Sequence, residues 1–480
     1  MYKGETTVFK SDKLNSHLNS VKIYDKILFG AAFILAFFFM SHPDLWETAN
    51  HSYVFLECLF DGQFMNFYDY CAAHNNSYYY INVANYNIVI YLIFGLWELP
   101  VFIINQLFGL AMNEQFIIYW AKLVPVAFFV GCGFMVKKIC EALDMDKATA
   151  SAAAMFFLFN PVAFYSPMAM GQYDTLCLFF TLFAVYWYIK GDLTKFSLFI
   201  GLGVVCKFFA LLVFVPLILV AEKRILHLVK NAAMALWIYI PTSLLFWGRT
   251  GNAKVFTQAM IDRMFSLTYE TGIRGVSIFT LFYAMMVFAC FVYVPKSEKT
   301  KKYLAVYLPM VSFGLLFNSI YWHPQWLILM VPFMVITTFT LKSRSMWFYL
   351  DVVFAAGYFL HCFYEYSSQT GAILFDGGLV HHMFGMRVIT SPIWQPLNYF
   401  LSLIPYVWVL TPVMFTGAIL LNIILKFPVG ETALSDKLSN SESYDKIPLK
   451  IFGYGIFVAG FICIWFVPSL FEALNAFGMI

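Results

Sequence analysis

The sequence predicts an all-α protein, a polytopic bundle of about 13 transmembrane helices with its N-terminus in the cytoplasm. Hydrophobic residues make up 61% of the 480 residues and charged residues only 12%, whereas about a quarter of a soluble domain is charged. The apolar residues stand in long runs, and the 30 Lys and Arg nearly balance the 27 Asp and Glu. This composition excludes a soluble enzyme, a disordered chain and a nucleic-acid binder with a basic face.

The apolar runs and their flanking charges define the expected order of spans. The spans are 27–41, 116–136, 148–165, 172–189, 196–206, 208–222, 231–248, 276–294, 303–320, 326–341, 346–363, 403–425 and 451–470. With these spans, about 23 of the 30 basic residues fall on one side, which identifies that side as the cytoplasm. The whole chain, 1–480, is expected to form one integral membrane domain, with 426–450 as a polar cytoplasmic linker.

The first span is expected to be a signal anchor that is not cleaved. Residues 1–25 are polar and lysine-bearing, and the first apolar run begins near Ile27. The outer loop that follows, 42–115, contains no Lys or Arg. Its stretch 87–111 is apolar enough to cross, but a crossing would invert every later loop. We therefore expect 87–111 to be a helix lying along the outer membrane surface.

The outer loop opens with two acidic residues in Ser-His-Pro-Asp-Leu-Trp-Glu, directly after the first span. Because proline stops the preceding helix, Asp44 is expected at the membrane boundary, where it would serve as a general base. Glu47 is its near rival. The alternative is that Asp44 is a solvated acid at a helix end. An Asp44–Glu47 pair at i, i+3 would hold a divalent metal only if the loop were helical there.

Two further groups of polar residues lie between apolar runs, one in an outer turn and one at membrane depth. Gln172, Tyr173 and Asp174 follow Asn160-Pro161 in the outer turn between the third and fourth spans, where they are suited to hydrogen-bond a polar ligand. The helix dipole also favours an acid at a helix start, which is the structural alternative for Asp174. Lys207 separates two short apolar runs, and a lysine there marks a site or snorkels to the surface.

Cationic side chains in the outer loops make up the last group of candidates. His323 lies in Tyr-Trp-His-Pro-Gln-Trp, between the ninth and tenth spans, and either binds a phosphate oxygen or caps a helix. Arg263 and Arg274, like Arg249 and Arg387, lie in outer loops against the positive-inside trend. Since Arg binds phosphate by paired hydrogen bonds, these residues indicate an anionic ligand.

The order of these pieces resembles the GT-C superfamily of polytopic glycosyltransferases, and in particular bacterial membrane proteins related to the GPI mannosyltransferases. The resemblance covers roughly residues 25 to 340 and is carried by Asn160-Pro161, the Gly-Gln-Tyr-Asp turn, the helix ending at Lys207 and the His-Pro-Gln-Trp turn. Met170 departs from the pattern, because a tryptophan often precedes Gly-Gln in such proteins.

The resemblance implies a function and a set of roles. The protein would transfer a hexose, most simply mannose, from a polyprenyl-phosphate donor to an extracytoplasmic glycan, lipid or protein, with inversion. Asp44 would be the base, with Glu47 as the near alternative. Gln172, Tyr173 and Asp174 would bind the acceptor or support its site, and Lys207, His323, Arg263 and Arg274 would bind the donor phosphate. No cofactor or metal is required, and the expected location is a bacterial plasma membrane, or the ER membrane in a eukaryote.

Two other classes stay open at this stage. A multispan transporter or flippase of lipid-linked sugars would explain the spans and the outer arginines, but not a large outer loop beside such short inner loops. A polysaccharide polymerase or ligase of related architecture would use a diphosphate-linked donor instead.

Overall fold

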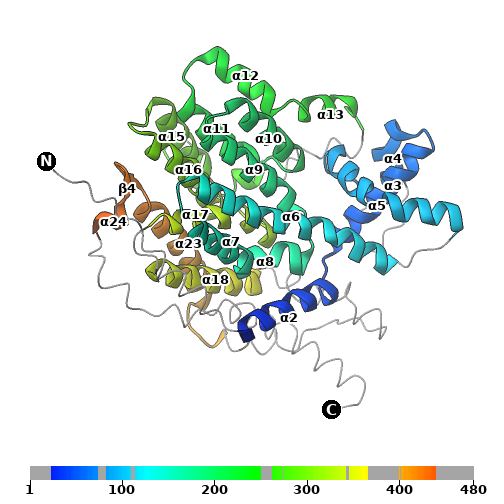
Figure 1. Cartoon of the computed structure of the whole chain (residues 1–480), viewed down its shortest axis with the longest axis horizontal. Coiled ribbons are helices and arrows are strands. Elements are labelled where there is room, and N and C mark those ends of the chain that lie inside the picture. The colour runs from blue at the N-terminus through cyan, green and yellow to red at the C-terminus, as the bar shows by residue number, and fades with distance from the viewer. Residues whose placement is uncertain are drawn as a thin grey trace.

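The computed structural model describes residues 23–73, 83–109, 114–249, 262–272, 274–341, 345–365, 399 and 402–438. Helices account for most of these residues (Figure 1). The longer helices are α2 (Ile23–Phe39), α3 (Pro43–Phe60), α5 (Ile88–Phe108), α6 (Glu114–Ala142), α7 (Lys147–Phe159), α9 (Asp174–Ile189), α10 (Leu193–Cys206), α11 (Ala210–Ala221), α12 (Ile225–Ala235), α15 (Ile278–Val292), α16 (Glu298–Ser319), α18 (Ser345–Glu365) and α23 (Val407–Leu425). The shorter ones are α4 (Phe67–Ala73), α8 (Pro161–Phe164), α13 (Tyr239–Leu245), α17 (Val331–Phe339) and α24 (Leu434–Leu438).

Two antiparallel hairpins are the only strands in the described part of the chain. One joins β1 (Thr268–Glu270) to β2 (Gly275–Ser277), and the other joins β3 (Pro428–Val429) to β4 (Thr432–Ala433). Each expected span up to residue 425 contains a helix, so the prediction of an all-α fold is confirmed. The last expected span, 451–470, lies outside the described residues.

The expected number of about 13 full-length spans is not supported by the helices. In the described residues, α5 and the part of α6 from Phe116 to Ala142 are long and apolar enough to cross a membrane, and counting two bent helix pairs as spans raises the number to four. One bent pair turns by 57° at Asn160–Pro161. Most of the other apolar helices have 10–17 residues, fewer than the roughly 20 that a straight crossing requires. Proline and extended residues interrupt runs that looked continuous in the sequence.

Helices α3, α4 and α5, in the segment expected as an outer loop, form a separate part of the molecule beside α6. Figure 1 shows α3, α4 and α5 together at one end of the bundle. Phe55, Phe67 and Tyr91 are buried in a small apolar cluster of this part, distinct from the main core. Cys58 and Cys71 belong to the same cluster and are both free thiols. The helix expected along the outer surface, α5, is one of the two that qualify as a span, so its orientation remains a prediction.

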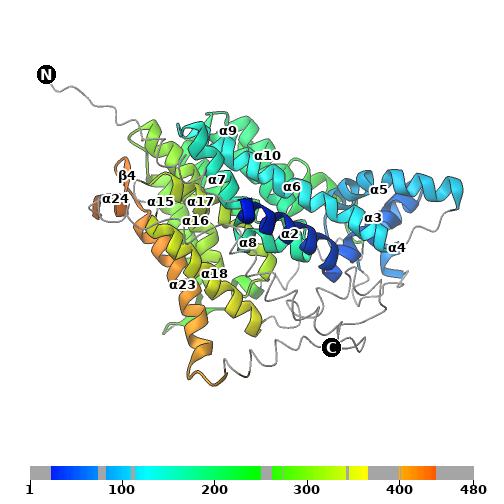
Figure 2. The same ribbon diagram turned by 60° about the horizontal axis from the view of Figure 1, so that its bottom comes forward.

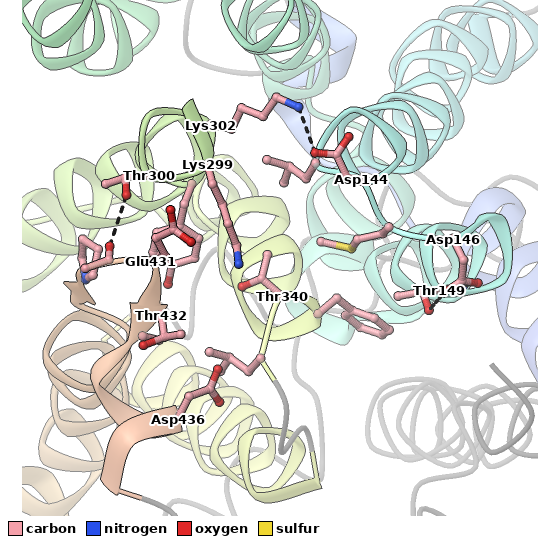
Figure 3. Close-up of a pocket in the computed structure, with 18 residues that line it drawn as sticks. Asp144, Asp146, Thr149, Lys299, Thr300, Lys302, Thr340, Glu431, Thr432 and Asp436 are labelled. Atoms are coloured by element: carbon pink, nitrogen blue, oxygen red, sulfur yellow. Dashed lines mark hydrogen bonds and ion pairs between the residues drawn. The ribbon is translucent and has the colours of Figure 1, made fainter. Parts of the chain in front are cut away.

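The segments expected on the cytoplasmic side meet at the other end of the bundle, around a cavity of about 730 Å³. Its walls come from the α6–α7 turn, the start of α16, the end of α17 and the β3–β4 hairpin. Figure 3 shows the Lys299 side chain reaching into it, and Lys302 bonded to Asp144 at 2.9 Å. Since α7, α16 and α17 each have one end here, their opposite ends lie on the side of Asn160, His323 and Gln172.

The first half of the expected linker 426–450 is folded, which differs from the expectation of a plain polar linker. The β3–β4 hairpin and α24 occupy 428–438, and Lys426 is fully buried. Its ammonium donates hydrogen bonds to Met334 O (3.0 Å) and Thr338 Oγ1 (2.7 Å). Figure 2 shows α23 running beside α18 toward this hairpin. Residues 439–450 lie outside the described part.

Candidate active site

Asp44 lies in the first turn of α3 and is held by its sequence neighbour His42 and by Gln172, which is distant in sequence. Pro43 starts the helix, and His42 is its N-cap, with Nδ1 accepting a hydrogen bond from the Asp44 backbone N–H at 3.2 Å. Gln172 Nε2 donates to Asp44 Oδ2 at 2.5 Å, and His42 Nδ1 lies 3.4 Å from Asp44 Oδ1. The Asp44 side chain is 28% exposed, so one side of the carboxylate remains open to a ligand.

Gly171 allows the Gly-Gln-Tyr-Asp turn to approach α3 this closely. Its φ of +69° is in the left-handed region, and a Cβ there would lie 2.7 Å from Leu45 Cδ2. The turn follows a π-helical segment, Tyr165–Met170, and the His42 backbone N–H donates to Met170 O at 3.2 Å. Glycine at 171 therefore positions Gln172 against Asp44, and π-helical turns are frequent at functional sites.

Asp174 and Lys207 form an ion pair beside Asp44. Lys207 Nζ lies 2.6 Å from Asp174 Oδ1, with side-chain exposures of 14% and 0%. Asp174 begins α9, whereas Lys207 has an extended backbone in the break between α10 and α11. Asp174 Oδ2 has no hydrogen-bond partner among the described residues. A largely buried cation and two acids from three separate segments thus share one location.

Two tyrosines form a wall of this cluster. The Lys207 ammonium lies 5.1 Å from the centroid of the Tyr173 ring, a distance at which a cation is attracted to the ring face. The edge of Tyr173 meets Tyr86, with centroids 4.9 Å apart. Tyr86 lies just before α5, so the aromatic wall joins the α3–α5 part of the molecule to the main bundle.

The ionised state of Asp44 is strongly favoured. Burial raises the pKa of Asp44. The charge and hydrogen bond of His42 in its protonated form, in which Nδ1 donates instead of accepting, the charge of Lys207 and the hydrogen bond from Gln172 outweigh burial, so that the pKa falls to about 2. The Lys207 ammonium is close enough to the Asp44 carboxylate for its charge to lower the pKa of Asp44. Asp44 is therefore an anion at any physiological pH.

The His-Pro-Gln-Trp turn adjoins the Lys207 break through edge-to-face contacts between aromatic rings. His323 precedes a 3₁₀ helix, Pro324–Leu329, and its ring lies 5.0 Å from that of Trp326. Trp326 in turn lies 5.0 Å from Phe209, two residues after Lys207. The Arg263 guanidinium lies 5.5 Å from the centroid of the Trp326 ring. His323 and Arg263 thus flank the same region as Lys207.

Two expected site residues lie apart from this cluster. Glu47 Oε2 lies 3.6 Å from His51 Nε2, one turn further along α3. Arg274 is exposed on the β1–β2 hairpin, and in the described part of the chain no ion pair or ring contact connects it to the other candidates. Arg249 is paired with Asp69 at 2.7 Å, and Arg387 lies outside the described residues.

A metal between Asp44 and Glu47 was expected only if this part of the loop were helical. It is helical, since both residues lie in α3. Within the described ranges, however, no group of three or more His, Cys, Asp or Glu side chains is arranged to hold a metal ion. Sequence reasoning missed His42, because histidine is not among the residues that usually cap helices. Its position directly before Pro-Asp was the one available signal.

The chain matches no protein-family model, no curated protein and no solved structure. Its function therefore has to be argued from the side chains gathered around Asp44.

Proposed function

We propose that this protein is an integral membrane glycosyltransferase of the GT-C type. It transfers a hexose, most simply mannose, from a polyprenyl-phosphate donor to an acceptor on the outer side of the membrane, with inversion at the anomeric carbon. The observation that carries the proposal is the meeting of Asp44, Asp174 and Lys207, from three segments, beside the His323 turn. A carboxylate base and cations for a phosphate are the two things that this reaction needs.

Asp44 acts as the general base in this proposal. The acceptor hydroxyl oxygen forms the new bond to the anomeric carbon while its proton passes to the Asp44 carboxylate. The bond from the anomeric carbon to the phosphate oxygen breaks, and polyprenyl phosphate leaves with the electron pair. Gln172 and His42 contact the two carboxylate oxygens and hold the base in one orientation. Glu47, which contacts His51, stays the alternative base.

Lys207, His323 and Arg263 receive the leaving phosphate. Asp44, Asp174 and Lys207 together carry a net charge of −1, so Lys207 alone does not make the site attractive to an anion. His323 and Arg263 supply further cationic groups on the same side. Arg263 lies over aromatic rings, an arrangement that leaves its N–H edge available for paired hydrogen bonds to phosphate oxygens. Arg274 has no role here.

The Asp174 carboxylate and the Tyr173 ring face the acceptor in this scheme. Asp174 Oδ1 is used by Lys207, whereas Oδ2 is unpartnered among the described residues. An unpaired carboxylate oxygen in a buried site readily accepts a hydrogen bond from a sugar hydroxyl, because leaving it unsatisfied is costly. Tyr173 is buried, and Tyr86, which is partly exposed beside it, is the ring of this wall on which a sugar would stack.

The membrane location belongs to the same proposal. A lipid-linked donor reaches the site sideways from the bilayer, so the protein needs a membrane-embedded bundle with the site at its outer edge. Two to four helices suited to crossing a membrane support this, and about 13 apolar segments remain the proposed full count. A bacterial plasma membrane is the proposed compartment, or the ER membrane in a eukaryote.

A transporter is the second candidate, and one observation favours it. Lys426 is fully buried at the end opposite Asp44, and Asp351 on α18 is within electrostatic range of it. Buried ionisable pairs in membrane proteins often mark ion or proton pathways. The glycosyltransferase mechanism makes no use of this pair.

One experiment separates these functions. The purified chain, reconstituted in liposomes, is incubated with a panel of polyprenyl-phosphate hexoses and of diphosphate-linked sugars. Release of polyprenyl phosphate from one monophosphate donor supports the proposal. Movement of the intact donor across the bilayer without release identifies a flippase, and release only from diphosphate donors identifies a polymerase or ligase.

A further inference from the structure

Helix α12 presents three different faces. Asn231 and Ala235 are buried toward α10, and Asn231 Oδ1 accepts a hydrogen bond from Ser197 Oγ at 2.8 Å. On the outward face, Ile225, Leu226 and Val229 are 73%, 82% and 61% exposed. Figure 1 shows α12 at the edge of the molecule. A helix that is tied to the bundle on one side and apolar on its exposed side is suited to contact lipid acyl chains.

The third face of α12 borders a cavity of about 530 Å³. His227, Lys230 and Met234, spaced one helical turn apart, line it from α12, and the α9–α10 turn closes the other side with Lys190 and Asp192. Both segments were expected on the cytoplasmic side from the distribution of basic residues. The cavity therefore opens where a bilayer presents its inner-leaflet headgroups.

The charges in this cavity leave two lysines unneutralised. Asp192 is paired with Lys195 at 3.1 Å. Glu222 accepts hydrogen bonds from Arg224 Nη2 at 2.7 Å and from two backbone N–H groups, and His227 Nδ1 lies 3.1 Å away. Within the described part of the chain, neither Lys190 nor Lys230 has an acidic partner. The acids are thus satisfied internally, while two exposed ammonium groups remain for an anion.

We infer that this cavity binds the phosphate headgroup of an anionic phospholipid from the cytoplasmic leaflet, with Lys190 and Lys230 as the phosphate ligands. The acyl chains lie along Ile225, Leu226 and Val229, whose exposed face is continuous with the cavity on the same helix. Basic pockets between helices on the cytoplasmic side are suited to such headgroups. The occupant is a lipid and not a free phosphate, because the cavity and the exposed apolar face lie on one short helix. One molecule with a phosphate headgroup and acyl chains can contact both. The inference is independent of the proposed glycosyl transfer.

The test is lipid binding by the full-length chain in detergent, with a phosphatidylglycerol titration followed by native mass spectrometry and phosphatidylcholine as the neutral lipid. At about 1 kcal/mol per basic residue, the variant Lys190→Gln/Lys230→Gln should bind phosphatidylglycerol roughly 10- to 30-fold more weakly. The matched control, Lys296→Gln/Lys299→Gln, removes two exposed lysines elsewhere and should bind like the parent. Melting temperatures establish that both variants are folded.

A second pair of substitutions distinguishes the lipid from free phosphate. Leu226→Ser/Val229→Ser should weaken phosphatidylglycerol binding while inorganic phosphate fails to displace the lipid. Equal affinity of the Lys190→Gln/Lys230→Gln variant and the parent would overturn the inference. So would equal binding of phosphatidylcholine, or full competition by inorganic phosphate with no effect of Leu226→Ser/Val229→Ser.

Discussion

The Asp44 carboxylate is held by His42 and Gln172, and this arrangement determines its response to pH. A carboxyl group whose pKa is lowered on folding contributes stability that is present above its unfolded pKa of about 3.9 and is lost as the pH falls through its folded value. For Asp44 that folded value is about 2. The base therefore stays ionised from about pH 5 to 8, and an acid limb in that range belongs to another group.

His42→Asn tests this dependence, because asparagine also caps helices but carries no charge. The substitution removes the largest of the effects that lower the pKa of Asp44, while burial, which raises it, remains. We expect the step of the pH–rate profile that reports Asp44, which lies below about pH 5 in the parent, to move to higher pH in the variant while its melting temperature stays close to that of the parent. An unchanged profile would show that His42 does not tune Asp44.

The Lys207–Asp174 pair is expected to carry stability as well as function. Removing one partner of a buried pair leaves the other charge uncompensated, so Lys207→Met should destabilise the protein by about 3–5 kcal/mol. Lys207→Met/Asp174→Asn should recover much of that loss, because no buried charge is left. Thermal unfolding in detergent measures both variants.

The more exposed pair Lys195–Asp192 provides the matched control for that cycle. Lys195→Met should cost less than about 1 kcal/mol. If the double variant were no more stable than Lys207→Met, the loss of stability in Lys207→Met would not come from leaving the Asp174 charge unpaired. Donor affinity is then best compared in the stable double variant, where a loss cannot be attributed to unfolding.

Several site residues could be predicted from the sequence because unusual positions revealed them. Asp44 follows a proline at the end of an apolar run, and Lys207 interrupts one. Their three-dimensional meeting could not be predicted, since it depends on Gly171 and on the cap formed by His42. Arg274 was predicted as a site residue from its charge alone, and the charge of a residue does not indicate where the hairpin that carries it lies in the fold.

At the scale of the element, Lys122 shows how a membrane lysine can serve structure. Lys122 lies inside the expected span 116–136, and its ammonium is fully buried at the C-terminal end of α2. It donates to Ala36 O (2.8 Å), Phe37 O (2.9 Å) and Met40 O. Ala36 O also accepts a hydrogen bond from the Met40 backbone N–H at 3.3 Å. The lysine supplies a further donor to the carbonyls at the end of α2, so it caps this helix just before His42 and Asp44.

Lys122→Met should therefore lower stability by roughly 1–3 kcal/mol, because buried carbonyls lose their hydrogen bonds. Turnover should fall as well, since the end of α2 positions Asp44. The exposed Lys147 is the matched control, and Lys147→Met should change stability by less than about 0.5 kcal/mol. Melting temperature and turnover are the two measurements. Equal values for both variants would remove the capping role.

Helix α5 carries the sharpest topological prediction. If it lies along the outer surface, exposed positions before and after it share one side. Gln63→Cys and Phe108→Cys should both react with a membrane-impermeant maleimide from outside, while Lys299→Cys reacts only from inside. Labelling of Phe108→Cys from the inside alone would mean that α5 crosses, as its length and hydropathy allow.

The positions of the helices could be predicted from apolar runs, but their lengths could not. Apolar composition reports that a segment is buried or in lipid, and it does not report where the backbone bends. The backbone of Asn160 is extended, so α7 ends there, inside an apolar run. The same residue caps the start of α8. The folding of 426–438 was missed for a related reason, because Lys426 is charged and yet finds its partners among threonines in the interior.

At the scale of the whole molecule, the bundle separates two chemically different ends. The cavity beside Lys299 and the basic cavity of α12 are lined by segments expected on the inner side. Asp44, Lys207 and His323 lie among segments expected on the outer side. This separation suits a protein that takes a lipid-linked substrate from the bilayer and releases its product outside.

In the proposed reaction, Asp44 removes the proton from an acceptor hydroxyl as a sugar leaves a polyprenyl phosphate. The most direct measurement is the rate of polyprenyl phosphate release by the reconstituted protein, compared between the parent, Asp44→Asn and Glu47→Gln. We expect Asp44→Asn to lose roughly 10²–10⁴-fold in turnover while it still folds and binds donor, and Glu47→Gln to lose far less. A rate for Asp44→Asn within about threefold of the parent would contradict the account.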